Sequence, residues 1–282
     1  DSTLVSTKRC LTFGIFNKEL YKKFFLTKEE IQAIKDGYIY IHDMSSRRDT
    51  MNCCIFDIEK VLHNGFEHGN LWYNEPKRLS SLAGVIGDIV LSAASQQYGG
   101  FTVPSVDEVI APYAEKTFLE YMDEYIDIVK GTGMIDEDNM PETLAILAQY
   151  HSMLEEEHTE EFDMGKELLK DTDSKLITLA QNYALKKVTK DLEQLFQELE
   201  YKFNSLSSSR GDYPFIAFTL GHGKKEFEQL TSIMCLEVRK NGQGKKGKKR
   251  PVLFPKLIFL YDEKLHGEGK PLEHVFQASI DC

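Results

Sequence analysis

The sequence lacks the features that define several classes of protein. No stretch of about 18 residues is apolar throughout, so we expect no transmembrane helix. Residues 1–9 do not show the basic-then-apolar order of a secretory signal peptide. Five cysteines among 282 residues are too few for a disulfide framework, and their odd number leaves at least one thiol unpaired. These absences predict a cytoplasmic protein that does not bind membranes.

Short catalytic and cofactor motifs are also scarce. The chain has no Walker loop and no Gly-x-Ser-x-Gly elbow, and we expect no dinucleotide-binding loop. Its cysteines include no Cys-x2-Cys pair of the kind found in zinc sites, so no metal is predicted. A hydrophobic content of 41% and an aromatic content of 11% indicate a globular protein with ample core.

Charge is distributed unevenly along the chain. The whole net charge of −11 lies between Gly131 and Glu200, where 17 acidic residues accompany six lysines. Such a run is typical of a solvated helical surface, and we interpret 131–174 as a peripheral acidic helical insertion. The segment 239–250 holds seven basic residues and no acidic one, without the interleaved aromatic residues of a nucleic-acid platform. We therefore expect an exposed basic loop and no binding of nucleic acid.

The residue pattern predicts alternating helices and short strands. Thr27 and Glu30 form a capping-box signature at the start of a helix that ends before Gly37. Apolar residues at helical spacing predict longer helices over 79–94, 107–129 and 176–199. Runs of β-branched and aromatic residues predict strands at 38–42, 214–220 and 252–261. The mixture indicates an α/β or α+β core.

Few residues suggest chemistry on their own. Cys53 and Cys54 are adjacent in an apolar run, and alternation along a strand would let only one of them face a given cavity. His42 precedes an aspartate that could orient its imidazole. Ser208 and Arg210 lie in a serine-rich turn whose backbone N–H groups and guanidinium could bind phosphate. Taken alone, these patterns predict an α/β protein with free thiols and one phosphate-binding turn.

Longer strings carry more information, and they occur in one order along the chain. They are 38–43 (Tyr-Ile-Tyr-Ile-His-Asp), 51–54 (Met-Asn-Cys-Cys), 65–70 (Gly-Phe-Glu-His-Gly-Asn), 74–77 (Asn-Glu-Pro-Lys), 97–100 (Gln-Tyr-Gly-Gly), 107–113 (Asp-Glu-Val-Ile-Ala-Pro-Tyr), 200–204 (Glu-Tyr-Lys-Phe-Asn), 214–215 (Pro-Phe) and 252–257 (Val-Leu-Phe-Pro-Lys-Leu). Together they resemble the catalytic subunit of the anaerobic, class III ribonucleoside-triphosphate reductases, a glycyl-radical family. The match covers nearly the whole chain outside the acidic region.

The resemblance implies a fold and a set of site residues. The family fold is a ten-stranded α/β barrel of two five-stranded halves, with a finger loop threaded through it. This chain would form the first half of that barrel, with peripheral helices, and 271–282 would begin the finger loop. Cys53 would lie on the first barrel strand as a hydrogen-donating thiol, and Cys282 would carry the thiyl radical. His42 and Asn52 would line the substrate site together with the serine-rich turn.

The resemblance also implies cofactors and partners. The reaction reduces ribonucleoside triphosphates to deoxyribonucleoside triphosphates under anaerobic conditions. It uses a glycyl radical made by a radical-SAM activating enzyme, and formate or a small redox protein as reductant. A dNTP or ATP effector would bind at a homodimer interface near Asn74 and Lys77. The basic loop 240–250 falls where the family has a mobile loop.

Departures from the family pattern leave alternatives open. The family's Arg-Val-x-Gly-Tyr radical loop, four-cysteine zinc site, second half-barrel and N-terminal ATP-binding domain are not in this sequence. We therefore expect a fragment that does not turn over substrate by itself. One alternative is an acyltransferase of the pyruvate formate-lyase kind, which also uses adjacent cysteines. Another is a non-catalytic module for dNTP sensing or dimerisation.

Overall fold

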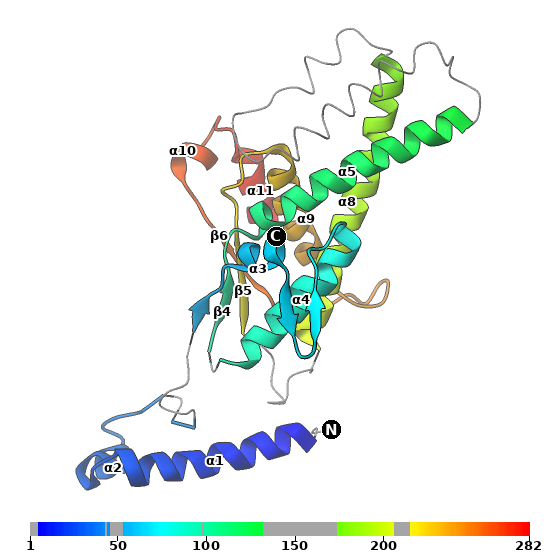
Figure 1. The fold of residues 1–282 in the computed structure, drawn as a ribbon. Coiled ribbons are helices and arrows are strands. Elements are labelled where there is room, and N and C mark those ends of the chain that lie inside the picture. The colour runs from blue at the N-terminus through cyan, green and yellow to red at the C-terminus, as the bar shows by residue number, and fades with distance from the viewer. Residues whose placement is uncertain (1–4, 43, 46–52, 98, 132–173, 206–214) are drawn as a thin grey trace.

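Residues 5–42, 44–45, 53–97, 99–131, 174–205 and 215–282 are described by a computed structural model (Figure 1). Three predicted site residues, Asn52, Ser208 and Arg210, lie outside this described part of the chain. So does most of the predicted acidic insertion, over 132–173. These predictions stay open, and the structural statements below concern the described residues.

A parallel sheet of four strands forms the centre of the fold. Its order is β1 (Cys54–Ile55), β4 (Phe101–Val103), β5 (Ile216–Leu220) and β6 (Lys256–Phe259), which is also their order along the chain. In the sequence between β1 and β4, the strands β2 (Phe66–His68) and β3 (Leu71–Tyr73) form a separate antiparallel hairpin. Since parallel strands need crossover connections, the chain returns through helices between successive strands of the central sheet. This arrangement confirms an α/β fold, while the five-stranded half-barrel stays a prediction.

Most of the predicted helices are present. The helices are α1 (Val5–Phe25), α2 (Lys28–Lys35), α3 (Ile58–Asn64), α4 (Leu79–Ser95), α5 (Val106–Gly131), α8 (Ser174–Asn204), α9 (Glu226–Asn241), α10 (Glu263–His266) and α11 (Glu273–Asp281). The capping box of α2 is confirmed, because the Glu30 backbone N–H donates to Thr27 Oγ1 at 3.2 Å and the Thr27 N–H donates to the Glu30 carboxylate at 2.7 Å. None of the described helices is both long and apolar enough to cross a membrane.

The helices cover one face of the sheet. Helices α4, α5, α8 and α9 lie on one side of the sheet (Figure 1). Alternate strand residues are fully buried in one core with residues of these helices: Phe101, Val103, Ile216, Phe218 and Leu220. The intervening residues point to the opposite face, where they are exposed or half-buried. Parallel sheets are normally covered on both faces, whereas the second face of this sheet is not covered by the helices of the core; we call it the open face.

Three predictions differ from the observed elements. The predicted strand over 38–42 is wrong: these residues pair with no described strand, and Tyr38 and Tyr40 are 84% and 83% exposed. Strand-forming composition produces a strand only where a partner supplies ladder hydrogen bonds. The predicted strand 252–261 is shorter and begins after Pro255, which has no N–H to donate. Residues 271–282, expected to begin a finger loop, are mainly the helix α11.

The buried face predicts a specific dependence of stability on Phe218. We expect Phe218→Ala to lower the free energy of unfolding by about 3–5 kcal/mol, because it empties a fully buried site on the central strand β5. The matched control is Phe215→Ala, which lies directly before the strand's first buried residue, Ile216, and is 50% exposed; for this variant we expect a loss of about 1–2 kcal/mol. Urea unfolding monitored by circular dichroism measures both. Equal losses for the two variants would contradict the assignment of the buried face.

Candidate active site

Cys53 lies at the edge of the sheet, on its open face. It precedes β1, and its Sγ accepts a hydrogen bond from the Gly100 backbone N–H at 3.2 Å, while its side chain is exposed. Gly100 contributes no side chain, and even a Cβ there would lie 3.9 Å from the sulfur. The backbone therefore holds the thiol in place and leaves space beside it.

Cys54 faces the other way. Its Sγ accepts a hydrogen bond from Gln97 Nε2 at 2.6 Å, and the side chain packs against the hydrophobic core. The two thiols therefore lie on opposite faces of the sheet, as the alternation of side chains along a strand requires. The strings 51–54 and 97–100, which are distant in sequence, thus meet around these two cysteines.

The open face around Cys53 is lined by uncharged side chains and one lysine. The pairing register aligns Ile55 with Thr102, Thr102 with Ala217 and Ala217 with Lys256, so one row crosses all four strands. These residues alternate with buried core residues, so their side chains share the face that carries Cys53. We call this surface, which runs from Cys53 and Ile55 to Lys256, the shelf. It has a thiol at one edge and an ammonium group at the other.

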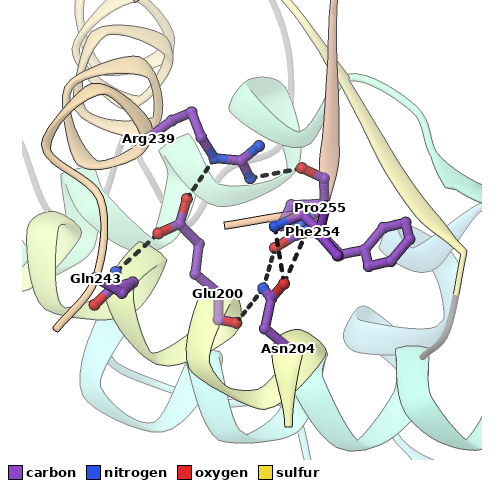
Figure 2. A network of polar contacts seen from close by, with 7 residues as sticks. Glu200, Asn204, Arg239, Gln243, Phe254 and Pro255 are labelled. Carbon is purple, nitrogen blue, oxygen red and sulfur yellow. Dashed lines mark hydrogen bonds and ion pairs between the residues drawn. The ribbon is translucent and has the colours of Figure 1, made fainter. Parts of the chain in front are cut away.

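A buried carboxylate organises the start of β6. Glu200, at the end of α8, accepts a hydrogen bond from Arg239 Nε at 2.7 Å and one from Gln243 Nε2 at 2.8 Å (Figure 2). Its side chain is only 5% exposed, and that of Arg239 is 16% exposed. Arg239 Nη2 also donates to the Pro255 carbonyl at 2.5 Å. A buried ion pair is tolerated when further hydrogen bonds satisfy its polar atoms, as they do here.

Asn204 holds the same segment from the other side. Its Nδ2 donates to the Phe254 carbonyl at 2.5 Å, and its Oδ1 accepts the N–H groups of Leu253 at 3.0 Å and Phe254 at 3.1 Å (Figure 2). The strings 200–204 and 252–257 are therefore in direct contact. Together with Arg239, this amide fixes the backbone from which Lys256 projects.

The basic segment is more ordered than the sequence indicated. Arg239 is part of helix α9 and is paired, while Gln243 and Arg250 exchange two backbone hydrogen bonds of 2.9 and 2.8 Å. The result is a small hairpin whose lysines are exposed. Residues 242–247 have the glycine spacing of a dinucleotide loop, which was not expected. They follow a helix and not a strand, so they lack the context of that motif.

Cys282 does not lie beside Cys53. It follows α11, which packs against α9 on the side of the sheet that the helices cover. Burial raises the pKa of the Cys282 thiol, and the nearby charge of Arg239 opposes that shift. The surroundings of Cys282 thus include α9 and the Glu200–Arg239 pair, whereas Cys53 points to the open face, and the joint role of the two cysteines stays a prediction.

The other described candidates are at the surface. His42 is in an exposed turn after α2. Asn74 and Lys77 are exposed in the segment that joins β3 to α4. Within that segment Glu75 accepts a hydrogen bond from Tyr113 OH at 3.1 Å, which attaches it to α5. The roles predicted for His42, Asn74 and Lys77 stay predictions.

Sequence reasoning missed the roles of three polar residues, although Glu200 and Asp107 lie in the quoted strings. Two are Glu200, which is buried, and Arg239, which is partly buried and begins the basic segment. The third is Asp107, which is 1% exposed and accepts hydrogen bonds from the Gly221 N–H at 2.9 Å and Ser232 Oγ at 2.8 Å. It thereby ties the turn after β5 to the start of α5. No set of three His, Cys, Asp or Glu side chains in the described residues could hold a metal ion.

Comparisons with known proteins point to one family. A family model described as anaerobic ribonucleoside-triphosphate reductase matches residues 2–282. The anaerobic ribonucleoside-triphosphate reductases of Enterobacteria phage T4 and Escherichia coli are each 27% identical over 285 residues. The match takes in 100% of this chain but only 39% of the phage protein and 33% of the bacterial one.

A solved structure shows a similar fold. It is the anaerobic ribonucleotide reductase from Thermotoga maritima with dATP bound in the specificity site, with a TM-score of 0.50 and 15% identity. The likeness covers 98% of this chain and 39% of that one. Fold and site thus define an α/β protein that presents a thiol on the open face of a parallel sheet. The chain belongs to the anaerobic ribonucleoside-triphosphate reductase family and spans well under half the length of these relatives.

Differences in burial predict different reactivities for three cysteines. We expect iodoacetamide to label Cys53 readily and Cys235 more than about tenfold more slowly, because burial raises the pKa of the Cys235 thiol and the thiolate is the reactive form. Since burial also raises the pKa of Cys282, its labelling should increase over a higher pH range than that of an ordinary thiol. Peptide mass spectrometry measures the three rates, with urea-unfolded protein as the control. Labelling of Cys235 as fast as that of Cys53 would contradict the fold.

Proposed function

We propose that this chain supplies part of the active site of an anaerobic ribonucleoside-triphosphate reductase. One observation carries the proposal: in a chain matched by the family model from end to end, an exposed thiol is held on the open face of the central sheet. The reaction replaces the ribose 2′-hydroxyl of a ribonucleoside triphosphate with hydrogen. Two electrons come from formate, which is oxidised to carbon dioxide, or from a redox protein, whose dithiol becomes a disulfide; the hydroxyl takes up a proton and leaves as water.

Cys53 acts in this proposal as a hydrogen donor to the ribose. The thiol lies beside a residue without a side chain, Gly100, so a sugar can approach the sulfur closely. The Gly100 N–H restricts the position of the sulfur, which favours a reactive geometry over a mobile one. A glycyl radical, when present, supplies the initial hydrogen abstraction; this chain's residues bind, orient and donate.

The proposal rests on Cys53 and not on Cys282. Helix α11 contacts α9, α10 and, through Ala278, the core cluster on the helical side of the sheet. The radical role of Cys282 stays a prediction. Binding of a radical-SAM activating enzyme and formation of a homodimer belong to the same proposal as properties of the family.

Substitution of Cys53 tests the catalytic proposal. In the activated protein that contains this chain, Cys53→Ser should reduce deoxycytidine triphosphate formation from CTP to background and leave CTP affinity nearly unchanged. A hydroxyl is a far poorer hydrogen-atom donor than a thiol, while its size is similar. Product formation is measured by chromatography under anaerobic conditions.

The matched control is Cys54→Ser, which keeps an acceptor for Gln97 on the opposite face. This variant should retain activity if only the open face carries the chemistry. Normal turnover by Cys53→Ser would refute the assignment. Effector binding without any turnover by the unsubstituted protein would support the non-catalytic module instead.

We further propose that an effector nucleotide binds near Asn74 and Lys77. The Thermotoga maritima enzyme holds dATP in a specificity site, and in this chain both residues are exposed on the segment before α4. Neighbouring side chains keep the segment in place: Glu75 is bonded to Tyr113, and Arg78 Nε lies 2.6 Å from the Glu120 carboxylate. Lys77 supplies a cation that can bind phosphate without first breaking an ion pair with a described residue.

A charge substitution tests the effector proposal. Lys77→Gln should weaken dATP binding about tenfold, the loss expected for one charged hydrogen bond of about 1.5 kcal/mol. Calorimetric titration with dATP measures the change. Lys264→Gln, on α10, is the control and should bind dATP as the unsubstituted protein does. Unchanged dATP affinity in Lys77→Gln would remove this residue from the site.

A further inference from the structure

Lys256 lies on the same face of the sheet as Cys53. It is the first residue of β6, and it pairs in register with Ala217 of β5. Leu257 and Phe259 point to the other face of β6 and pack against the hydrophobic core. Because side chains alternate along a strand, Lys256 points to the open face. The lysine and the thiol therefore project from opposite edges of one surface.

Lys256 is the single charged residue in its row across the sheet. Ile55, Thr102 and Ala217 complete that row and carry no charge. Lys256 itself is exposed and forms no ion pair with a described residue. Its ammonium group thus creates a positive potential at one end of a shelf that otherwise offers uncharged side chains to a ligand.

The backbone of Lys256 is unusually well fixed for an edge strand. The preceding carbonyl, that of Pro255, accepts a hydrogen bond from Arg239, and Phe254 is held through both its N–H and its carbonyl by Asn204 (Figure 2). Glu200 in turn orients Arg239. A cation on a fixed backbone binds an anion at a lower entropic cost than one on a loose segment.

The spacing across the sheet suits an elongated anionic ligand. Neighbouring strands are separated by about 4.8 Å, so β1 and β6 are about 14 Å apart, and the lysine stem shortens the remaining distance to the thiol. A nucleotide whose ribose lies over Cys53 would extend its phosphates along the shelf toward Lys256. We propose that Lys256 binds the polyphosphate of the ribonucleoside triphosphate and thereby positions its ribose at Cys53. The substrate class in this inference rests on the proposed function.

A different explanation needs no ligand. Lysines on edge strands discourage pairing with other sheets, and β6 is an edge of the described sheet. The two explanations differ in one measurable property. If Lys256 binds phosphate, its replacement reduces the dependence of affinity on the number of phosphates in the ligand, whereas replacing a lysine that only prevents edge pairing leaves that dependence unchanged.

Calorimetric titration of the 282-residue chain with CTP, CDP and cytidine measures that property. The unsubstituted chain should bind CTP more tightly than CDP and CDP more tightly than cytidine. Lys256→Gln should weaken CTP binding about tenfold, which corresponds to about 1.4 kcal/mol, and leave cytidine binding unchanged. Lys256→Arg should restore most of the CTP affinity, because a guanidinium also binds phosphate. The salt dependence of CTP binding should be smaller in Lys256→Gln.

The matched control is Lys186→Gln, which removes an exposed lysine of α8 on the helical side of the sheet. Its CTP affinity should equal that of the unsubstituted chain. The inference is overturned if the unsubstituted chain does not discriminate CTP from cytidine. It is also overturned if Lys256→Gln binds CTP normally, including the case in which that variant only aggregates more readily.

Failure of this inference is distinguishable from failure of the proposed function. If Cys53→Ser abolishes reduction while Lys256→Gln keeps normal CTP affinity, Lys256 has no phosphate role and the reductase assignment stands. If Lys256→Gln loses phosphate-dependent binding while no protein containing this chain reduces CTP, Lys256 binds nucleotide phosphates and the reductase assignment falls.

Discussion

The alternation of side chains along four parallel strands is the constraint on which the rest of this structure depends. Burial of Phe101, Phe218 and their alternate neighbours against the helices determines which residues must point the other way. A slip of one residue in β1 would bury Cys53 and expose Cys54. The position of the Cys53 thiol is therefore set by the apolar strand residues whose burial fixes the register of the sheet.

The ion pair between Glu200 and Arg239 fixes the edge strand β6, as the buried strand residues fix the centre of the sheet. An edge strand has one pairing partner, so the position of the first residue of β6 depends on side chains that bind the preceding loop. Arg239, oriented by Glu200, donates a hydrogen bond to Pro255 in this loop. The free-energy cost of removing both charges from water is offset by hydrogen bonds to Gln243 and Pro255. The same hydrogen bonds that stabilise the loop also determine the position of the Lys256 backbone. Stability and site geometry thus share one network.

Sequence reasoning succeeded where the determinants were local and failed where they were not. The capping box at Thr27 and the apolar stripe of α4 are written within a few residues, so both helices could be predicted. The strand at 38–42 could not be judged, because a strand needs a partner that composition does not reveal. The resemblance predicted site roles for Cys53 and Cys282 but gave no information on where the fold places the two thiols, because that depends on the packing of α11 against α9. The network around Glu200 joins segments 39 and 50 residues apart, a separation that no short motif encodes.

Helix α4 connects the two proposed nucleotide sites. It has 17 residues and is therefore about 25 Å long, beginning beside Lys77 and ending next to the Gln97–Gly100 segment that contacts both cysteines. Its packing on α8 is close: a Cβ at Gly87 would lie 2.6 Å from Lys202 Cδ, and Lys202 Nζ lies 3.7 Å from Asp88 Oδ1. Such tight contact opposes bending of α4 between its ends. One stiff helix therefore joins the segment that carries Lys77 to the segment that contacts the two thiols. The same helix packs on α8, whose last residue, Asn204, holds the loop before β6, so packing around α8 fixes both edges of the sheet relative to each other.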